Sequence, residues 1–324
     1  MLYFRFPFSD QLYTTDEDSS ENAVTFHSFD ENEKLFFTGN ITEISERDFL
    51  KNEVFSDELI SEINDFTEES RTFYEQKISE VIDVIKQKQL AKVVISRRKL
   101  LDLSNKIVSL SRTFLQLCNS YPNALVYFFI KGERCWLGAF SELLGKFNRK
   151  SGAFETMSLA GTLPLNETWS AKETEEQMAV TDFIKSVLVN YSQSVEQGET
   201  CDHISGNIKH LRTDFKAAVS AEILPQLIAE LHPTPAVCGI PKAICKDIID
   251  DFEEHPRKFY AGYIEIETEG FLQYFVNLRC AEFFRNAALI YVGGGITADS
   301  QPAKEWQETE LKAEALLNNI IFAP

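Results

Sequence analysis

No CxxC pair occurs in this sequence, and its six cysteines are scattered along the chain. The usual spacing of a structural zinc site is therefore missing, and thiols spread in this way through 324 residues indicate a reducing compartment. The amino-terminal MLYFRFPFSDQ lacks the basic start and unbroken apolar run of a signal peptide. Apolar runs long enough to cross a bilayer are absent as well. We expect reduced, mostly buried thiols, a cytosolic location, no zinc site and no membrane partner.

Basic residues are also scarce. The chain has 50 acidic and 32 basic residues and a formal net charge of -18, and no basic cluster is longer than SRRK at residues 96–99. Nucleic-acid binders present a basic face, so we expect no nucleic-acid partner. A negative charge of this size repels an anionic substrate at long range. An anion site in this protein therefore needs local compensation, which a divalent cation could provide.

Hydrophobic and aromatic residues, in contrast, are abundant at 44% and 12% of the chain, enough for a large buried core. No internal repeat is visible, and no linker divides the sequence after residue 75. Predicted strand pairs joined by short turns alternate with helical stretches. This order predicts an α+β fold with large, mainly antiparallel sheets flanked by helices.

Several predicted elements carry the residues discussed below. We expect a helix over 217–230, a strand followed by a loop in AFETMSLAGTLPL, one long strand in FLQYFVNLRCAEFF, and a strand ending in a glycine loop in AALIYVGGGI. A long helix is predicted in SAKETEEQMAVTDFIKSVLVNYSQSV, and a further helix in KEWQETELKAEALLNNI. The predicted core face of the first is Met178, Val180, Phe183, Ile184 and Val187.

Two glutamate pairs have the same spacing. Glu173 and Glu176 in AKETEEQ, like Glu305 and Glu308 in KEWQETE, are three residues apart on predicted helices, so each pair shares a helix face. Carboxylates placed in this way repel each other unless a positive charge lies between them. Two such pairs could form an oxygen cage for a hard cation such as Mg²⁺. The alternative is a pair of solvated acidic faces, and spacing alone does not decide between them.

Lys92 and Glu142 adjoin apolar strands. Alternation in AKVVIS places Lys92 opposite Val93 and Ile95, and burial of its face would lower the pKa of Lys92 and make it a usable general base. The alternative is an exposed strand lysine that discourages edge pairing. Glu142 in WLGAFSELLG follows an aromatic strand, where apolar surroundings would raise its pKa toward that of a general acid. Otherwise it is an acidic residue at a helix N-terminus.

Three further features could bind an anion. Arg279 interrupts an apolar strand in NLRCAEF, and its guanidinium needs an anionic partner, either a substrate carboxylate or an internal salt bridge. Gly293 to Gly295 could offer backbone N–H groups to a carboxylate or form a tight turn. They do not match GxGxxG, so a dinucleotide-binding fold is not indicated. His210 in IKHLR could equally be a satisfied core histidine.

The order of the motifs is more specific than any one of them. Across residues 92–312 it resembles the chorismate-utilising enzymes, the family of anthranilate, aminodeoxychorismate, salicylate and isochorismate synthases. The resemblance implies a single domain over 1–324, with variable strands in 1–74 and the family core in 75–324. It also implies two large antiparallel sheets packed together, helices outside, and an active site in the cleft between them. The motifs are KVVISR, LAGT, KETEEQ, LHPTPAVCGIPK, FYAGY, LRCA, YVGGGI and EWQETELK.

The branch of the family is readable at two positions. Ala160, just before Gly161–Thr162, occupies the position at which aminodeoxychorismate synthases carry a nucleophilic lysine. Ala236, in HPTPAVCG, is the residue of isochorismate synthases, whereas salicylate synthases carry threonine. The resemblance therefore implies an isochorismate synthase that feeds menaquinone or siderophore synthesis, with menaquinone favoured because no siderophore-specific feature is visible. The alternatives are a salicylate synthase, which also eliminates pyruvate, and a catalytically silent metal-binding homologue.

The resemblance also implies chemical roles. Lys92 would deprotonate the water that attacks C2 of chorismate, and Glu142 would protonate the departing C4 hydroxyl. Mg²⁺ would hold the ring carboxylate and help that hydroxyl to leave. Its ligands would be Glu176 and Glu308, with Glu173 and Glu305 binding directly or through water.

Chorismate is a dicarboxylate, and the implied substrate-binding residues lie around both of its ends. They are Arg279 and Tyr260 with Gly293 and Gly295 at the enolpyruvyl carboxylate, Lys312 and Gly161–Thr162 at the ring carboxylate, His210 near the leaving hydroxyl, and Ala236. We expect a monomer without a glutamine amidotransferase partner. The chain departs from the family pattern where Phe140-Ser141-Glu142 replaces Ser-Pro-Glu, Gln177 replaces a histidine, and Glu265 replaces a glycine.

Overall fold

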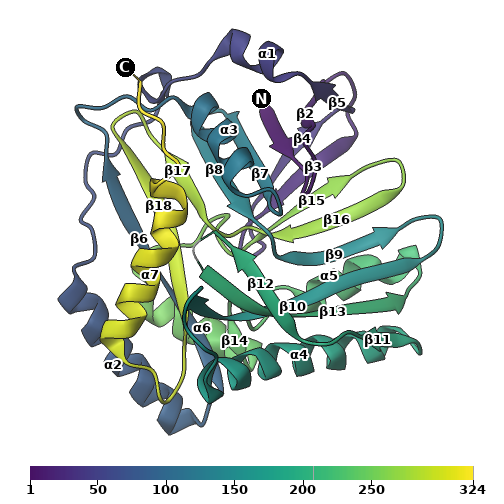
Figure 1. Ribbon diagram of the computed structural model, residues 1–324, viewed down its shortest axis with the longest axis vertical. Helices are drawn as coiled ribbons and strands as arrows, with labels where there is room; N and C mark the ends of the chain where they lie inside the picture. The colour runs from purple at the N-terminus through teal and green to yellow at the C-terminus, as the bar shows by residue number, and fades with distance from the viewer. Residues whose placement is uncertain (207, 324) are drawn as a thin grey trace.

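Two antiparallel sheets of nine strands each form the centre of the protein, whose computed structural model describes residues 1–206 and 208–323 (Figure 1). Sheet A has the order β14-β6-β18-β17-β8-β7-β1-β2-β5, and sheet B the order β11-β13-β10-β9-β16-β15-β3-β4, with β12 paired to β13. The predicted fold class is confirmed. The strands are β1 Leu2–Arg5, β2 Leu12–Thr15, β3 Asn22–His27, β4 Lys34–Thr38, β5 Ile41–Ile44, β6 Lys92–Asp102, β7 Leu125–Lys131, β8 Arg134–Phe140, β9 Leu143–Asn148, β10 Ala153–Pro164, β11 Val195–Gln197, β12 Cys201–Ser205, β13 Ile208–Ala218, β14 Gly239–Ile240, β15 Tyr263–Glu267, β16 Phe271–Val276, β17 Cys280–Phe283 and β18 Ala287–Ile296.

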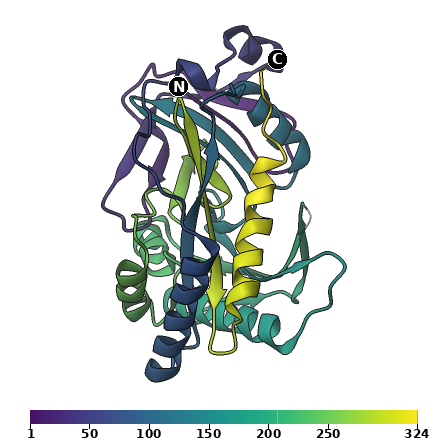
Figure 2. The same cartoon turned by 90° about the vertical axis from the view of Figure 1, so that its left-hand side faces the viewer.

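Helices cover the outer faces of the sheets. α2 and α7 lie side by side against β6 and β18, and α4 packs on β10 and β13 (Figures 1 and 2). Over the described residues, no helix combines the length and the apolar character needed to cross a membrane. The helices are α1 Glu46–Phe49, η1 Leu50–Asn52, η2 Ser56–Glu58, α2 Arg71–Lys88, α3 Leu110–Ser120, α4 Ala171–Tyr191, η3 Ala221–Ile223, α5 Leu224–Leu231, α6 Lys242–Phe252 and α7 Pro302–Leu317.

The core has two parts, which lie on opposite faces of strand β7. Successive side chains of this strand point alternately into one part and the other. Leu125, Tyr127 and Phe129 face the large cluster that the two sheets share, whereas Val126 and Phe128 face the smaller cluster beneath α3 and α7. Burial on both faces explains why β7 is almost continuously apolar. The six cysteines are free, and five of them are buried, as predicted.

Helix α4 corrects one detail of the predicted core face. Val180, Ile184 and Val187 are buried, but Met178 is 57% exposed and Phe183 is only half-buried. The buried stripe continues upward from Val180 through Gln177, so Met178 lies about 100° away from it on the helix surface. The predicted helix over 217–230 also starts later, because β13 runs to Ala218.

Three predicted strand ends are wrong, and two of the corrections shape the site. FLQYFVNLRCAEFF is not one strand, because β16 belongs to sheet B and β17 to sheet A, with Arg279 in a left-handed conformation between them (φ 44°). Gly293 to Gly295 form no loop and lie inside β18, paired with β6. The loop predicted after the strand in AFETMSLAGTLPL is absent from most of that stretch, because β10 runs to Pro164, with an irregularity between Ala160 and Leu163.

The chain crosses between the sheets six times over the described residues, and two of these crossings lie in adjacent places. One crossing joins β8 to β9 through Ser141–Glu142, and the other joins β16 to β17 through Asn277–Arg279. The Val276 amide donates to the Glu142 carbonyl at 3.0 Å, which ties the two crossings together. The amino-terminal strands extend both sheets, β1, β2 and β5 in sheet A and β3 and β4 in sheet B. The domain division at residue 74 stays a prediction.

Candidate active site

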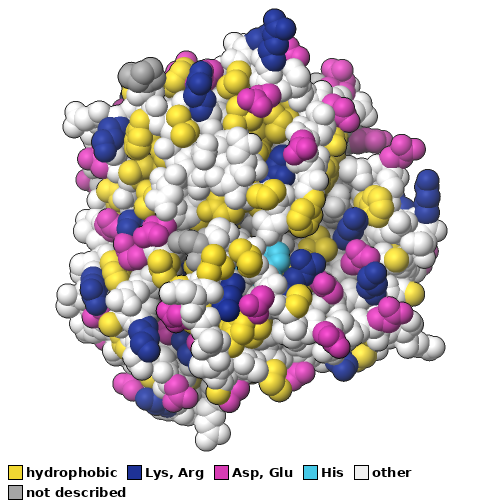
Figure 3. Space-filling view, in the orientation of Figure 1, with side chains coloured by type: hydrophobic (Ala, Val, Ile, Leu, Met, Phe, Trp, Pro, Cys, Tyr) yellow, Lys and Arg dark blue, Asp and Glu magenta, His cyan; other side chains and the backbone are white. Residues whose placement is uncertain are grey.

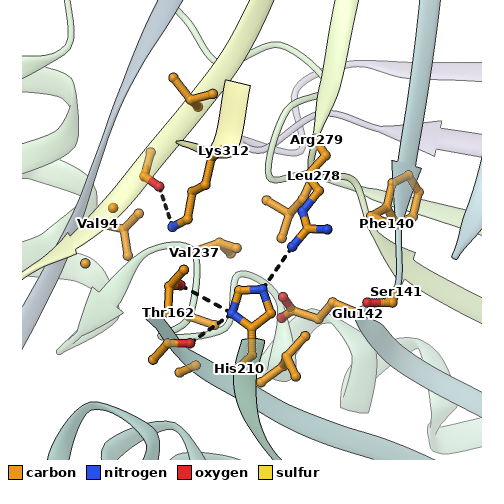
Figure 4. Close-up of a pocket in the computed structure, with 18 of the residues that line it drawn as sticks. Val94, Phe140, Ser141, Glu142, Thr162, His210, Val237, Leu278, Arg279 and Lys312 are labelled. Atoms are coloured by element: carbon orange, nitrogen blue, oxygen red, sulfur yellow. Dashed lines mark hydrogen bonds between the residues drawn. The ribbon is translucent and has the colours of Figure 1, made fainter. Parts of the chain in front are cut away.

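A pocket opens where the two crossings meet the glycine-rich part of β18. In the surface view, a histidine and basic side chains lie together near the middle of the face (Figure 3). The close-up shows side chains from β6, β8, β10, β13, α7 and the two crossings converging on it (Figure 4). Most of the predicted site residues line this pocket: Glu142, Gly161, Thr162, Glu176, His210, Ala236, Tyr260, Arg279, Gly293, Gly295 and Lys312.

Lys92 begins β6 and is buried, with an exposed fraction of 3%, so the alternative of an exposed edge lysine is wrong. Its Nζ donates to Glu176 Oε1 at 2.6 Å. A side chain at Gly295 would place Cβ 2.4 Å from Lys92 Cε and 2.7 Å from Glu176 Oε1. Burial opposes ionisation of Glu176, but Lys92, Lys312 and Lys172 together lower its pKa. Glu176 is therefore held as a carboxylate beside Lys92, and Gly295 provides the space for the pair.

Glu142 lies in the β8–β9 crossing, outside any helix, which excludes the helix-terminus alternative. Only 4% of the residue is exposed. Burial raises the pKa of Glu142 to about 7, against the opposing positive charge of Lys92. A carboxyl group of this kind is protonated at neutral pH in a useful fraction and can donate a proton.

Arg279 points into the pocket beside His210. Its Nη2 donates to His210 Nε2 at 2.9 Å, and its Nη1 donates to Ser205 Oγ. Because arginine only donates, His210 Nε2 accepts, and Nδ1 carries the proton given to the Gly161 carbonyl at 2.8 Å. Burial and the charge of Arg279 hold the pKa of His210 well below its usual range. Among the described residues no carboxylate forms an ion pair with Arg279, so its guanidinium is available to an anion.

Lys312 on α7 reaches the pocket from the opposite side. Its Nζ donates to Glu308 Oε1 at 2.7 Å and to the Gly293 carbonyl at 2.8 Å. The hydroxyl of Tyr260 lies 2.9 Å from the place where a Cβ on Gly293 would be. Gly293 therefore allows the close approach of Tyr260 to the β18 backbone. Two cations, Arg279 and Lys312, thus flank the pocket, as a dicarboxylate would require.

The four predicted metal ligands do not all behave alike. Among the residues that the structure describes, no three His, Cys, Asp or Glu side chains are arranged closely enough to hold a metal ion. Glu305 is 1% exposed and accepts from Lys172 Nζ at 2.9 Å, while its Oε2 is buried without a hydrogen-bond partner. Burial, and then the charge of Glu308, raise the pKa of Glu305. A buried, partnerless carboxylate oxygen beside a second carboxylate fits a hard cation.

The positions of these carboxylates also favour a cation site. Glu305 Oε2 and Glu308 Oε1 each lie 3.5 Å from the Cβ position of Gly294, and Glu176 Oε1 lies 2.7 Å from that of Gly295. Three carboxylates therefore border two consecutive residues of β18. Glu173 differs, because its Oε2 accepts from the Ser170 amide and hydroxyl in a capping box.

The sequence did not identify the contribution of β12. Ser205 contacts Arg279, and His203 Nε2 lies 2.9 Å from Ser141 Oγ beside Glu142. This short strand carries no motif, and its contacts are between residues far apart in the sequence. Lys172, the partner of Glu305, was missed as well, although it lies within KETEEQ.

A family described as "Chorismate binding enzyme" matches residues 15–321, so the chain belongs to the chorismate-binding enzymes. Its relatives include isochorismate synthases. Identity is 28% to the salicylate biosynthesis isochorismate synthase of Pseudomonas aeruginosa, over 78% of this chain and 55% of that protein. It is 29% to isochorismate synthase EntC of Escherichia coli, over 76% and 67%. The chain thus spans between about half and two thirds of the length of these relatives.

Solved structures agree on the fold. DhbC of Bacillus anthracis has a TM-score of 0.79 at 22% identity, covering 98% of this chain and 95% of that one. The menaquinone-specific isochorismate synthase MenF of Escherichia coli has a TM-score of 0.76 at 20% identity, covering 98% and 88%. Component I of anthranilate synthase from Streptococcus pneumoniae has 0.72 at 18%, covering 98% and 90%. The fold is shared across branches of the family.

Proposed function

We propose that this protein is an Mg²⁺-dependent isochorismate synthase that converts chorismate reversibly into isochorismate. The observation that carries the proposal is one pocket lined by a protonatable Glu142, by Glu176 with its buried partner Lys92, and by two cations, Arg279 and Lys312. The named relatives in the isochorismate branch support it. Acid, base and two anion-binding groups are the parts that this isomerisation needs.

The reaction adds a hydroxyl group from water at C2 and releases the C4 hydroxyl as water. In its neutral amine form, Lys92 takes a proton from water as the new C2–O bond forms, and the ring double bonds shift. Glu142 gives its proton to the C4 hydroxyl as that C–O bond breaks, so a water molecule leaves and the net change is an isomerisation. Arg279 and Lys312 bind the two carboxylates and fix the ring between acid and base.

Glu176, Glu305 and Glu308 would hold Mg²⁺, with Glu173 contributing directly or through water. The bound cation supplies charge compensation at the ring carboxylate and electron withdrawal from the ring. Neutral His210 accepts from Arg279 and so keeps the guanidinium directed into the pocket. Burial of the Glu305 oxygen without a partner is unfavourable, and a bound cation would compensate for it.

The direct test is to incubate purified protein with chorismate and Mg²⁺, with and without EDTA, and to identify the products by chromatography. Isochorismate that disappears with EDTA supports the proposal. Salicylate with pyruvate would move the protein to the salicylate synthase branch, against the interpretation of Ala236. Unchanged chorismate, bound without turnover, would support the silent metal-binding homologue.

The pH profile follows from Glu142. Its protonated form is the acid, and its pKa is about 7, so the forward rate should have a limb that falls as the pH rises through 7. Measurement of kcat from pH 5.5 to 9 checks this. In Glu142→Gln the rate should fall by about 10²–10⁴-fold and this limb should vanish.

We also propose a cytosolic monomer without a glutamine amidotransferase partner, since the proposed reaction uses water and no ammonia. The product would enter menaquinone or siderophore synthesis. We prefer menaquinone, because no siderophore-specific feature is visible in the sequence and a structural neighbour is named for menaquinone.

A further inference from the structure

Strand β12 lies behind the pocket and contacts residues that line it. Among the described residues it pairs only with β13, and His203 lies directly opposite His210 in that pairing. His203 and Ser205 are buried, whereas Ile204 between them and Asp202 before them are exposed. The alternation shows that β12 directs His203 and Ser205 inward.

The inward side chains reach the β8–β9 crossing and the β16–β17 crossing. His203 Nε2 lies 2.9 Å from Ser141 Oγ, in the crossing that carries Glu142. Ser205 Oγ accepts from Arg279 Nη1, in the crossing that carries Arg279. One strand therefore contacts the residue next to the proposed acid and the proposed carboxylate-binding residue itself.

The charge of His203 and a neighbouring amide group give the direction of the hydrogen bond between His203 and Ser141. Burial, and then Arg212 and Arg279, lower the pKa of His203 to about 4, so its imidazole is neutral. Asn123 Nδ2, which only donates, lies 3.5 Å from the same Nε2. Nε2 is therefore the acceptor, and the Ser141 hydroxyl donates to it.

We infer that β12 positions the catalytic groups, with His203 fixing the Glu142 crossing through Ser141, and Ser205 fixing Arg279. This inference rests on the proposed function. In the family pattern given above, proline takes the position of Ser141 and restricts the backbone with its ring. Serine has no such restriction, and here a hydrogen bond to a neighbouring strand holds the turn in its place. His203 and Ser205 are positioning residues, since they act through Glu142 and Arg279.

Steady-state kinetics separate the two arms of β12. Ser141→Ala and His203→Phe should each lower kcat about fivefold, the loss of one ordinary hydrogen bond, and change KM less than twofold. The double variant should lose no more than the larger single loss, because both changes remove the same contact. Ser141→Thr, which keeps the hydroxyl, should restore the rate. Ser205→Ala should instead raise KM about fivefold with kcat nearly unchanged.

The pH profile adds a readout that a merely structural role would not change. Freed from its anchor, Glu142 gains contact with water, so the falling limb near pH 7 should move to lower pH in Ser141→Ala. Ile204→Thr is the matched control, since Ile204 lies on the same strand but is 59% exposed. Its kinetics and pH limb should equal those of the unaltered protein. Thermal unfolding of every variant shows whether it is folded.

Nitrogen-15 NMR of the five histidines tests the contacts without any turnover. Ser141→Ala should shift the Nε2 signal of His203, assigned with His203→Phe, and Ser205→Ala should shift that of His210, which accepts from Arg279. If the unaltered protein makes no isochorismate but these shifts occur, the proposed function fails and the contacts stand. If the protein is active and the variants match it in kcat, KM, pH limb and NMR, β12 positions nothing and the inference is overturned.

Discussion

The two Glu-x-x-Glu pairs share one spacing but have different surroundings. On α4, Glu173 caps its own helix through Ser170, and Glu176 pairs at 2.6 Å with Lys92 from β6. On α7, Glu305 is buried against Glu308 and keeps an oxygen without a partner. The α4 pair is therefore satisfied by its neighbours, whereas the α7 pair keeps a buried carboxylate oxygen without a partner although Lys172 and Lys312 contact it.

This difference shows what spacing can and cannot determine. Three residues of separation place both carboxylates of a pair on one helix face. Their protonation and their partners come from other elements, such as β6, which supplies Lys92, and α4, which supplies Lys172 to Glu305. We expect the α4 pair to act mainly through Lys92 and the α7 pair mainly through Mg²⁺.

The largest expected effect comes from removing the partner of Glu176. Lys92→Met should lower the rate by about 10²–10⁴-fold in both directions of the reaction, because the proposed base is lost. Lys77→Met is the matched control, since Lys77 is also buried and pairs with Glu69 at 2.5 Å outside the pocket. Both variants should lose stability of about 3–5 kcal/mol in thermal or urea unfolding. Equal loss of rate per folded molecule in both would contradict a special role for Lys92.

A smaller but still large effect is expected at Gly295. In Gly295→Ala the new methyl group would lie 2.4 Å from Lys92 Cε and would separate Lys92 from Glu176. Displacement of the base by about 1 Å should cost about 10²-fold in kcat. Gly270→Ala is the control, because nothing lies within 4 Å of its Cβ position. If Gly295→Ala retains full activity, the space at Gly295 does not set the position of Lys92.

The glutamate pairs themselves should respond in opposite ways. The raised pKa of Glu305 means that its charge is unfavourable in the folded protein, so Glu305→Gln should raise the melting temperature without metal. Its Mg²⁺ affinity should fall about 10–100-fold. Glu173→Gln weakens the capping box and should lower the melting temperature, at a cost of about 0.5–2 kcal/mol, with a smaller loss of Mg²⁺ affinity.

Thermal melts with and without Mg²⁺, and titration of the Mg²⁺ dependence of the rate, check this crossed pattern. The same response from both variants would show that the two pairs are equivalent, contrary to the account above.

The sequence predicted the two-sheet fold and most of the pocket lining, because ordered motifs such as LAGT, FYAGY and YVGGGI keep their places in the family. Local patterns were less successful at strand ends. The apolar run around Arg279 predicts one strand, but the chain changes sheets there, and only the tertiary structure determines that crossing. Gly293 to Gly295 resemble a loop by composition, although pairing with β6 keeps them in β18.

The missed site residues have a common cause. His203 and Ser205 lie on a short strand without a periodic pattern, and they contact Ser141 and Arg279, which are far away in the sequence. The apolar strand before Glu142 predicted the raised pKa of that residue. The burial that raises the pKa, however, depends on the crossing between the sheets. Contacts of this kind are set by packing, which propensity does not encode.

The central claim is that water attacks chorismate at C2 while the C4 hydroxyl departs from the same pocket. The most direct measurement is a reaction in H₂¹⁸O with Mg²⁺, stopped early and analysed by mass spectrometry. The account predicts isochorismate that carries one ¹⁸O atom, at the C2 hydroxyl. Isochorismate without label, or no isochorismate at all, would contradict it.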